Sequence, residues 1–559
     1  MNIIVAKILL ENLLNRVELQ DDGSKQLTGV LTDAELEALQ FAVAQLTSER
    51  REDTEASSES TQPTSASVLQ QDRELELNLN TLSLPEPPND VRLCLDFGTA
   101  MSKATLVHEN DDTDIEEIHV LRLGVPGDQE EISEVMLISS VFIDGDGFLW
   151  FGKSAVNRSM IEGGDGTRQR LDNIKRSLSE EGHDDIVSKR FNPTNVEVTY
   201  GDMVLAYLMF LTWAVNRCLD DLGYPLNLPR RYAMPCLTGE KRRETSHRLK
   251  QLVGEAQILA DTFGADLANG IPVVDFMAAV GNLRHCQRIF PFVAEGITEP
   301  LGVASSIVSW TNQVDSLILV IDVGAGTSDL SLYRLRIDPK EDINVAMEVE
   351  DSSRVLTEAG NHLDKILIEL IIKKGGITSD NPRWENIRGA LELEIRDHKE
   401  TLFNEGSVFI TLMNSTEVEI ELNEFLEHNA VKSFGNNLKE IMVQILESID
   451  ESWVGWITAN PKRKLAVALT GGGSELPMVR ALAEGSISVN GKDIPVFRSK
   501  QFPDWLRELD ENLEYDYPRV AVSLGGARKQ MIKDGGTANI TGGDVTSSAV
   551  LGGFYTKGN

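Results

Sequence analysis

The chain has 559 residues, 41% of them hydrophobic, which is enough for one large domain or two to three ordinary ones. Its formal net charge of -35, from 88 acidic and 53 basic residues, would repel a phosphate backbone or an anionic bilayer. We therefore expect no nucleic-acid partner and no membrane partner. The four cysteines show no metal-ligand spacing and are too few for a disulfide framework, so we expect reduced thiols and a cytoplasmic location.

Residues 1–50 are predicted to form a small helical segment. Lys7 and Glu11 interrupt the apolar run of residues 1–19, and no small-residue cleavage site follows, so an amphipathic helix is favoured over a signal peptide. A second helix is indicated by the capping box of Thr32 and Glu35 ahead of an apolar stripe. These helices either recruit a protein partner or pack against the rest of the chain.

Three further segments complete the predicted organisation. Residues 51–90 are rich in Ser, Thr, Glu and Gln and cannot bury enough apolar surface to offset the entropy of ordering, which predicts a flexible acidic linker. Residues 91–530 alternate apolar strands with amphipathic helical segments, the pattern of an α/β domain. Residues 531–559 are glycine-rich with little periodicity, and we expect a mobile tail.

The α/β domain contains an internal duplication. The stretch "RLCLDFGTAMSKATLV" at 92–107 and the stretch "LILVIDVGAGTSDLSLY" at 317–333 are both apolar strands that end in Asp-x-Gly, followed by a small-residue turn and a second strand. A repeat of this kind predicts two similar lobes that face each other, with Asp96 and Asp322 at the rims of one cleft.

Each of these turns has the residues that bind phosphate oxygens. Glycines let backbone amides approach an anion closely and threonine hydroxyls add donors, so Gly98 and Thr99 in the first turn, and Gly324, Gly326 and Thr327 in the second, are candidate phosphate ligands. A single Asp-x-Gly after a strand is usually only a turn. The duplication favours a site, because buried aspartates at two equivalent positions would be costly as mere scaffolding.

Carboxylates that face a polyphosphate need a hard cation between them. Mg²⁺ keeps most of its waters when a few carboxylates hold it, so Asp96, Asp322 and Asp329 are candidates for a water-mediated magnesium site. A third glycine turn links a strand to a helix and is placed to receive the nucleoside end of a nucleotide. Its candidate residues are Gly471, Gly472, Gly473 and Ser474.

With these motifs in this order, residues 91–530 resemble the actin-like ATPase superfamily, and most of all the nucleotide-binding domain of DnaK-like heat-shock-protein-70 chaperones. The stretches "SSVFIDGDGFLWFGKSA", "ITEPLGVASSIVSW", "EAGNHLDKILIELI" and "RVAVSLGGARKQM" are similar to further segments of that domain. The resemblance implies an actin-like ATPase fold, in which two duplicated ribonuclease-H-like lobes surround a cleft for Mg²⁺ and ATP or ADP.

The resemblance also implies roles for individual residues. Lys175 in "LDNIKRSLSE" would offset charge on the γ-phosphate, with Arg176 as the alternative, and Glu299 would orient the attacking water. Lys399 in "EIRDHKETLF" would lie on the helix that faces the adenosine. The candidate catalytic residues are thus Asp96, Lys175, Glu299, Asp322 and Asp329, in which the aspartates hold magnesium-bound waters or the nucleophile.

Four departures from the family pattern affect what is expected. Ala100 stands where a second hydroxyl is typical, and Glu400 and Glu475 stand where the family has arginines against the base, so the sequence gives adenine no local support. Only residues 531–559 follow the domain, where the chaperones continue into a peptide-binding β-sandwich and a lid. The peptide-holding cycle is therefore not expected here.

Several functions are compatible with this pattern. The first is a chaperone-like protein that binds and slowly hydrolyses Mg-ATP and acts as a conformational switch on a partner, through the N-terminal helices or a lobe surface. The alternatives are a nucleotide-binding scaffold without turnover, an actin-like filament-forming ATPase and a small-molecule kinase.

Overall fold

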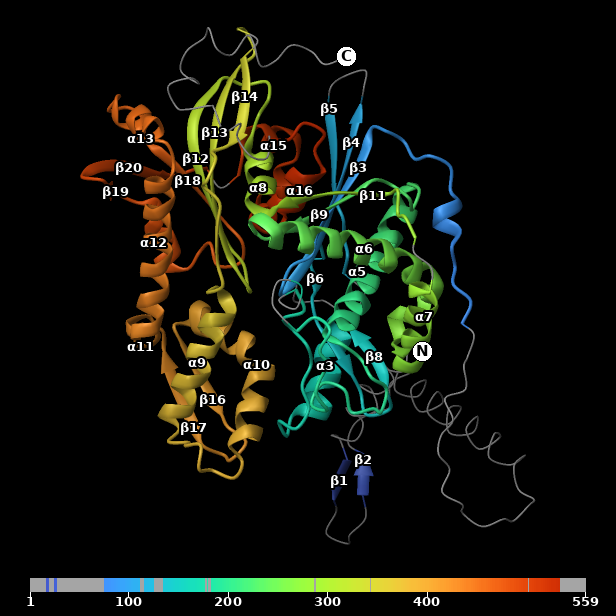
Figure 1. Cartoon of the computed structure of the whole chain (residues 1–559). Coiled ribbons are helices and arrows are strands. Elements are labelled where there is room, and N and C mark those ends of the chain that lie inside the picture. The colour runs from blue at the N-terminus through green and yellow to red at the C-terminus, as the bar shows by residue number, and fades with distance from the viewer. Residues whose placement is uncertain are drawn as a thin grey trace. The chain divides into compact units, whose positions relative to one another are not determined.

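The computed structural model describes residues 17–19, 25–27, 75–110, 115–124, 134–175, 178, 182–285, 288–341, 343–500 and 502–532. The chain divides into two compact units, Met1–Gln71 and Asp72–Asn559. The larger unit is a mixed α/β structure with several sheets and many helices (Figure 1). This is the fold class that the alternation of strands and helices predicts.

The described part of the smaller unit is a short antiparallel pair of strands, β1 (Val17–Leu19) and β2 (Lys25–Leu27), with Val17 opposite Leu27. The prediction that 1–50 is helical is therefore wrong at these residues, which include the end of the first expected helix. In β1 the apolar Val17 and Leu19 flank Glu18, an alternation that suits a strand. The capping box of Thr32 and Glu35 lies outside the described residues.

The first sheet of the larger unit has the strand order β11-β9-β3-β4-β5, and β6 pairs with β4. Its strands are β3 (Val91–Asp96), β4 (Met101–Asn110), β5 (Ile115–Val120), β6 (Leu137–Ile138), β9 (Arg230–Met234) and β11 (Val293–Thr298). β3, β4 and β5 form an antiparallel meander, and β9 and β11 continue the sheet in parallel from β3.

The second sheet repeats this topology. Its order is β14-β13-β12-β18-β20-β19, with β15 paired to β13. Again an antiparallel meander is continued in parallel from its first strand, here by β18 and β20, and β19 is added antiparallel to β20 at the edge. Its strands are β12 (Val314–Val323), β13 (Ser328–Asp338), β14 (Ile343–Glu348), β15 (Arg354–Leu356), β18 (Leu465–Thr470), β19 (Ser486–Val489) and β20 (Lys492–Arg498). The duplication seen in two short stretches therefore extends over whole sheets.

Helices cover the outer face of each sheet. Against the first sheet lie α5 (Tyr200–Leu222), α6 (Gly239–Phe263), η2 (Gly264–Asn269) and α7 (Val273–Arg284), next to a small sheet of β7 (Val141–Ile143), β8 (Phe148–Phe151) and β10 (Ile271–Pro272) with α3 (Gly152–Gly163). Against the second sheet lie α12 (Asn429–Ser448), α13 (Glu451–Thr458), α14 (Pro477–Arg480) and η3 (Ala481–Ala483). Beyond the ends of β12 and β13 the same core continues into a group that packs on itself (Figure 1): α9 (Gly360–Lys374), α10 (Trp384–Glu405), β16 (Ser407–Thr411), β17 (Glu417–Glu421) and α11 (Leu422–Glu427).

A third apolar core joins the inner faces of the two sheets. It contains α8 (Glu299–Ile307), α15 (Asp504–Leu509), η4 (Glu511–Glu514) and α16 (Tyr517–Ala527), and Figure 1 shows α8 and α16 between the two sheets. Strand β12 is apolar at successive positions because both of its faces are buried. Leu319 and Ile321 face the outer helices, while Val320 faces α8 and α16.

Helix α5 is the most buried helix of the first core. Thr199 and Asp202 form a reciprocal capping box at its start, and Gly223 ends it in the left-handed conformation. By length and composition this helix could span a membrane, but 89% of its apolar window is buried inside the protein, as in a core helix.

Residues 75–90 lie against α6, so the predicted flexible linker over 51–90 is wrong for this part. Thr81, in the short η1 helix (Asn80–Ser83), is 3% exposed and its hydroxyl donates to Asp261 Oδ2 at 2.5 Å. The backbone N–H of Asn78 donates to Thr262 Oγ1 at 3.0 Å, and Leu77 and Leu82 pack on the first core. The sequence analysis missed this ordered segment because its few leucines stand among mostly polar residues. The remaining 51–74 and 533–559 lie outside the described residues.

Helices α8 and α16 approach each other so closely that their contact requires glycine. A Cβ on Gly302 would lie 2.6 Å from the Val522 carbonyl oxygen, and one on Gly525 would overlap the Gly302 carbonyl oxygen. The absence of a side chain at Gly525 therefore allows α8 and α16 to pack between the two sheets.

We predict that Gly525→Ala destabilises the protein by about 1–3 kcal/mol, the usual cost of overpacking a filled interior. Gly455→Ala in α13 is the control, because its Cβ would meet nothing within 4 Å and alanine favours a helix. Thermal and denaturant unfolding of both variants checks this. Equal midpoints for G525A and wild type would contradict the contact.

Candidate functional site

Asp96 and Asp322 occupy equivalent positions at the ends of β3 and β12, the first strand of each meander. In the first hairpin Asp96 lies opposite Lys103, whose Nζ is 3.4 Å from Asp96 Oδ2. In the second hairpin Asp322 lies opposite Asp329. The first hairpin thus pairs its aspartate with a lysine, and the second hairpin pairs its aspartate with another aspartate.

The turns of the two hairpins meet. A Cβ on Gly326 would lie 2.6 Å from Thr99 Oγ1, so the second turn approaches the first closely enough to exclude a side chain at this point. Within the second turn the N–H of Gly324 donates to the Thr327 carbonyl at 3.0 Å. The structure therefore brings the predicted phosphate-binding residues Gly98, Thr99, Gly324, Gly326 and Thr327 into two facing turns.

The third glycine turn lies beside Asp322, because β18 pairs in parallel with β12 and sets Thr470 next to Asp322. Gly471 has a positive φ of 81°, and a Cβ there would overlap Asp322 Oδ1, so glycine is required. The N–H of Gly473 donates to the Val323 carbonyl at 2.9 Å, and Ser474 is buried. Gly472 is exposed at the outer side of the turn.

Lys175 and Glu299, expected to act separately, form a buried ion pair. Burial by itself would lower the pKa of Lys175, but the carboxylates of Glu299, Asp96 and Asp329 raise it above its ordinary value, so the lysine is charged. Lys175 is therefore part of the same charge cluster as the strand-end aspartates. Arg176, the alternative counterpart, lies outside the described residues.

The surroundings of the two aspartates of the second hairpin disfavour their charged form. Burial, then Glu299, Asp329 and Asp96, raise the pKa of Asp322 well above its usual range. Burial and Glu299 raise the pKa of Asp329 to about 7, against hydrogen bonds that lower it. Asp329 Oδ1 accepts from the Cys236 N–H at 2.6 Å, while Oδ2 has no partner among the residues that the structure describes.

The charge and the free oxygen fit a divalent cation. Four carboxyl groups (Asp96, Glu299, Asp322, Asp329) share the cluster with two ammonium groups (Lys103, Lys175), which leaves two uncompensated negative charges when all are ionised. Across the described ranges, no three His, Cys, Asp or Glu side chains converge closely enough to ligate one ion directly. The hypothesis of magnesium contacts through water does not require such a group.

Lys399 reaches the second turn through helix α9. Its Nζ lies 2.5 Å from Asp364 Oδ1 and donates to the Gly360 carbonyl at 3.1 Å. The N–H of Gly360 in turn donates to the Gly324 carbonyl at 3.1 Å. Lys399 therefore belongs to the wall of the site and stabilises the start of α9.

Lys103 and Cys236 are site residues that the sequence analysis missed. Lys103 follows Asp96 by seven residues, the same spacing as Asp329 after Asp322, so a comparison of the two hairpins position by position would have found it. Cys236 contributes its backbone N–H, which leaves no signal in the side-chain pattern.

A clamp of residues 165–173, just before Lys175, fastens α10 to the first half of the molecule. Arg170 and Gln169 are buried, and they donate to the carbonyls of Leu393 at 2.7 Å and of Gly389 at 2.8 Å. Asn173 Oδ1 accepts from Asn361 Nδ2 at 2.7 Å. The clamp therefore holds both α9 and α10 at the site.

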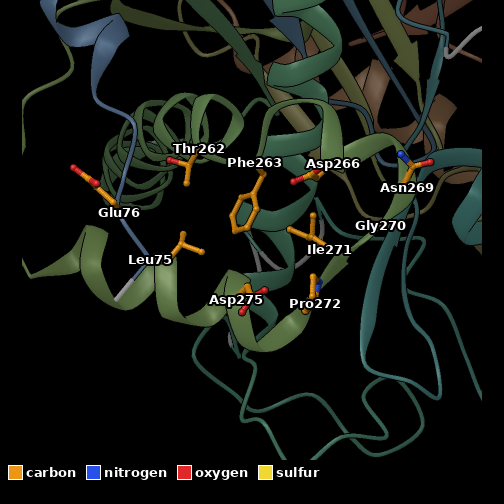
Figure 2. Close-up of a pocket in the computed structure, with 10 residues that line it drawn as sticks. All are labelled: Leu75, Glu76, Thr262, Phe263, Asp266, Asn269, Gly270, Ile271, Pro272 and Asp275. Atoms are coloured by element: carbon orange, nitrogen blue, oxygen red, sulfur yellow. The ribbon is translucent and has the colours of Figure 1, made fainter. Parts of the chain in front are cut away.

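A separate pocket of about 400 Å³ is lined by no predicted site residue (Figure 2). Figure 2 shows Phe263 at its centre, with Leu75 and Ile271 on either side. The other lining residues are Glu76, Thr262, Asp266, Asn269, Gly270, Pro272 and Asp275.

Comparison with known proteins gives no further assignment. No protein-family model matches the chain, and no curated protein matches its sequence.

The raised pKa of Asp329 predicts a pH dependence of stability. The ordinary value of 3.8 becomes about 7 in the folded protein, so the folded state binds this proton more tightly and the stability is lost as the pH rises from about 4 to about 7. Between these pH values the free energy of unfolding of the wild type should fall by up to about 1.4 kcal/mol per pH unit through this group, and Asp329→Asn should remove that part of the fall. Denaturant unfolding at pH 5 and pH 8 measures it.

Asp338→Asn, at the other end of the same strand, is the matched control and should keep the wild-type decline. A D329N variant with an unchanged pH dependence would contradict the burial of this charge.

The contacts of Arg170 predict that the clamp stabilises helix α10. Arg170→Ala removes the side-chain donor to the Leu393 carbonyl and the ion pair with the partly buried Asp172, which keeps only the Ser140 hydroxyl, so we expect a loss of about 3–5 kcal/mol, as for breaking a buried ion pair. Amide exchange of α10 should accelerate. Arg388→Ala on the same helix breaks a half-exposed pair with Glu392 and should change stability by only about 0.3–0.5 kcal/mol. Equal exchange in both variants would exclude a clamp.

Proposed function

We propose that this chain is a nucleotide-binding protein with a two-lobed actin-like ATPase fold, similar to the DnaK-like heat-shock-protein-70 nucleotide-binding domain. The observation that supports it best is the meeting of three glycine turns around the end of β12, where Asp322 lies. Two sheets of the same topology, with α8 and α16 between them, are compatible with duplicated ribonuclease-H-like lobes.

In this proposal each turn has a part in binding. The backbone N–H groups of Gly98 and Gly326 and the hydroxyl of Thr99 bind phosphate oxygens, as facing anion-binding turns. Asp96, Asp322 and Asp329 hold Mg²⁺ through its waters, and this ion would offset the negative charge of the cluster and of the phosphates. The Gly471–Ser474 turn receives the nucleoside. ATP and ADP are the nucleotides that the resemblance implies.

Hydrolysis of the nucleoside triphosphate to a diphosphate and phosphate would use the ion pair of Lys175 with Glu299 and the carboxyl group of Asp329. Lys175 stabilises the negative charge that develops on the transferred phosphoryl group, and Glu299 both holds Lys175 and orients water. Asp329 is suited to take the proton of the attacking water, because its Oδ2 has no hydrogen-bond partner among the residues that the structure describes and a carboxylate can act as a general base. Slow turnover would then change the relation of the two lobes, and a cytoplasmic partner protein would sense that change through the N-terminal segment or a lobe surface.

A nucleotide-binding scaffold without turnover is the second candidate. The observation that favours it is that Lys175 pairs with Glu299 within the protein, so part of the charge of the lysine is compensated before any substrate binds. The two proposals share the binding site and differ only in chemistry.

Calorimetric titration of ATP, ADP and GTP with Mg²⁺ into the full chain tests the proposal. We expect one of them to bind and Asp322→Ala to weaken that binding by about 100-fold or more, since a buried carboxylate at the cation site is lost. Asp493→Ala, on the exposed part of β20, is the control and should bind as wild type does. No heat with any nucleotide would overturn the site.

Turnover separates the two candidates. In a single-turnover assay with the protein in excess over nucleoside triphosphate, Lys175→Ala should bind the nucleotide within about tenfold of the wild-type affinity. It should release phosphate about 100-fold more slowly than the wild type. If the wild type releases no phosphate under the same conditions, the scaffold is the function.

A further inference from the structure

The pocket of about 400 Å³ has walls from two parts of the chain. One wall is the segment of Leu75 and Glu76, and the others are the end of α6, the η2 helix, β10 and the start of α7. The segment is fixed to both long helices. Asn78 Nδ2 donates to the Asp261 carbonyl of α6 at 3.1 Å. Asn282 Nδ2 of α7 donates to the Leu75 carbonyl at 2.9 Å, so α6 and α7 together hold the segment that completes the pocket.

The lining of this pocket is negative. Its ten residues include Glu76, Asp266 and Asp275 and no lysine or arginine. Glu76 and Asp266 form no ion pair with a basic side chain in the described ranges. Because nothing in the lining offsets the repulsion among these carboxylates, the pocket favours a positively charged ligand.

The ends of two helices add to this preference. Helix α6 is 25 residues long, and its last two residues, Thr262 and Phe263, line the pocket. The carbonyl groups at the C-terminal end of a helix carry a partial negative charge that stabilises cations. The start of α7 carries the opposite partial charge, but Asp275 lies in its first turn. The pocket therefore has a negative group at each of these helix ends.

The carboxylates are spread around an apolar centre. Figure 2 shows Phe263 in the middle of the pocket, with Asp266 and Asp275 on opposite sides of its ring. No three His, Cys, Asp or Glu side chains of the described chain converge on one point, so the lining does not suit a metal ion. An aromatic ring attracts ammonium groups to its face and packs against methylene groups. The lining therefore suits separated positive charges joined by an apolar stem.

We propose that this pocket binds an aliphatic polyamine, whose ammonium groups pair with Asp266 and Asp275 while its methylene stem lies along Phe263. Glu76 adds negative charge from the segment that completes the pocket. A volume of about 400 Å³ is within the range of small-molecule sites. The inference does not depend on nucleotide binding, because no residue of the three glycine turns lines the pocket.

The ligand should also stabilise the segment. Leu75 and Glu76 complete the pocket, so a ligand that contacts them binds the arrangement in which α6 and α7 hold the segment. Ligand binding and docking of the segment then favour each other through one coupling free energy. We therefore expect a polyamine to protect the amides of residues 75–84 from exchange.

The test is calorimetric titration of spermidine into the full chain at about 0.15 M salt, where contacts with the acidic surface are screened. We expect one molecule to bind per chain and Asp266→Asn to weaken binding by about fivefold, as for one partly screened ion pair. Phe263→Leu keeps an apolar side chain and should weaken binding by a similar factor, because the ring is lost. Asp221→Asn, an equal change of charge at the exposed end of α5, should bind as wild type does.

Hydrogen exchange gives a second readout. Spermidine should slow the amides of 75–84 and 262–275 in the wild type and leave those of α12 unchanged. Equal affinities of D266N, D221N and wild type would overturn the site, because binding would then come from the net charge of the surface. Tighter binding of a trilysine peptide than of spermidine would assign the pocket to a basic protein segment and overturn the polyamine. No heat from spermidine with a wild-type protein of normal thermal midpoint would also overturn it.

Discussion

The repulsion among buried carboxylates at the strand ends is the constraint on which the account depends. Asp322 and Asp329 are opposite each other in one hairpin, and Glu299 and Asp96 raise the pKa of Asp322 from outside it. Such a cluster costs folding energy unless a cation or protons offset it. Lys103 and Lys175 supply part of the compensation, and the remaining negative charge is what the proposed magnesium ion would offset.

The duplicated sheet is the reason that these groups meet. In each half the first strand of the meander has the parallel strand on its other side, so its end is central in the sheet and surrounded by turns. The glycine contact between α8 and α16 allows both inner faces to share one core. The site is therefore built by the packing of whole sheets, and the loops add the specific contacts.

The sequence predicted the parts of the site that a local pattern carries. The Asp-x-Gly repeat pointed to Asp96 and Asp322 and the small residues pointed to the glycine turns, and the structure brings these turns close together. The pairing of Lys175 with Glu299 could not be predicted, because 124 residues separate them and only the fold brings them together. The clamp of Arg170 binds backbone carbonyls, which every residue has, so its partners leave no trace in the sequence. Sparse leucines likewise hid the ordered segment at 75–90.

Hydrogen exchange with and without Mg²⁺ and a nucleoside diphosphate tests the central claim most directly, because it reports each turn separately. The account predicts slower exchange at all three turns together, 96–103, 322–329 and 471–475, with little change in the outer helices α12 and α13. Protection confined to one turn, or protection elsewhere with these turns unchanged, would contradict a single site formed by the two hairpins and the glycine turn.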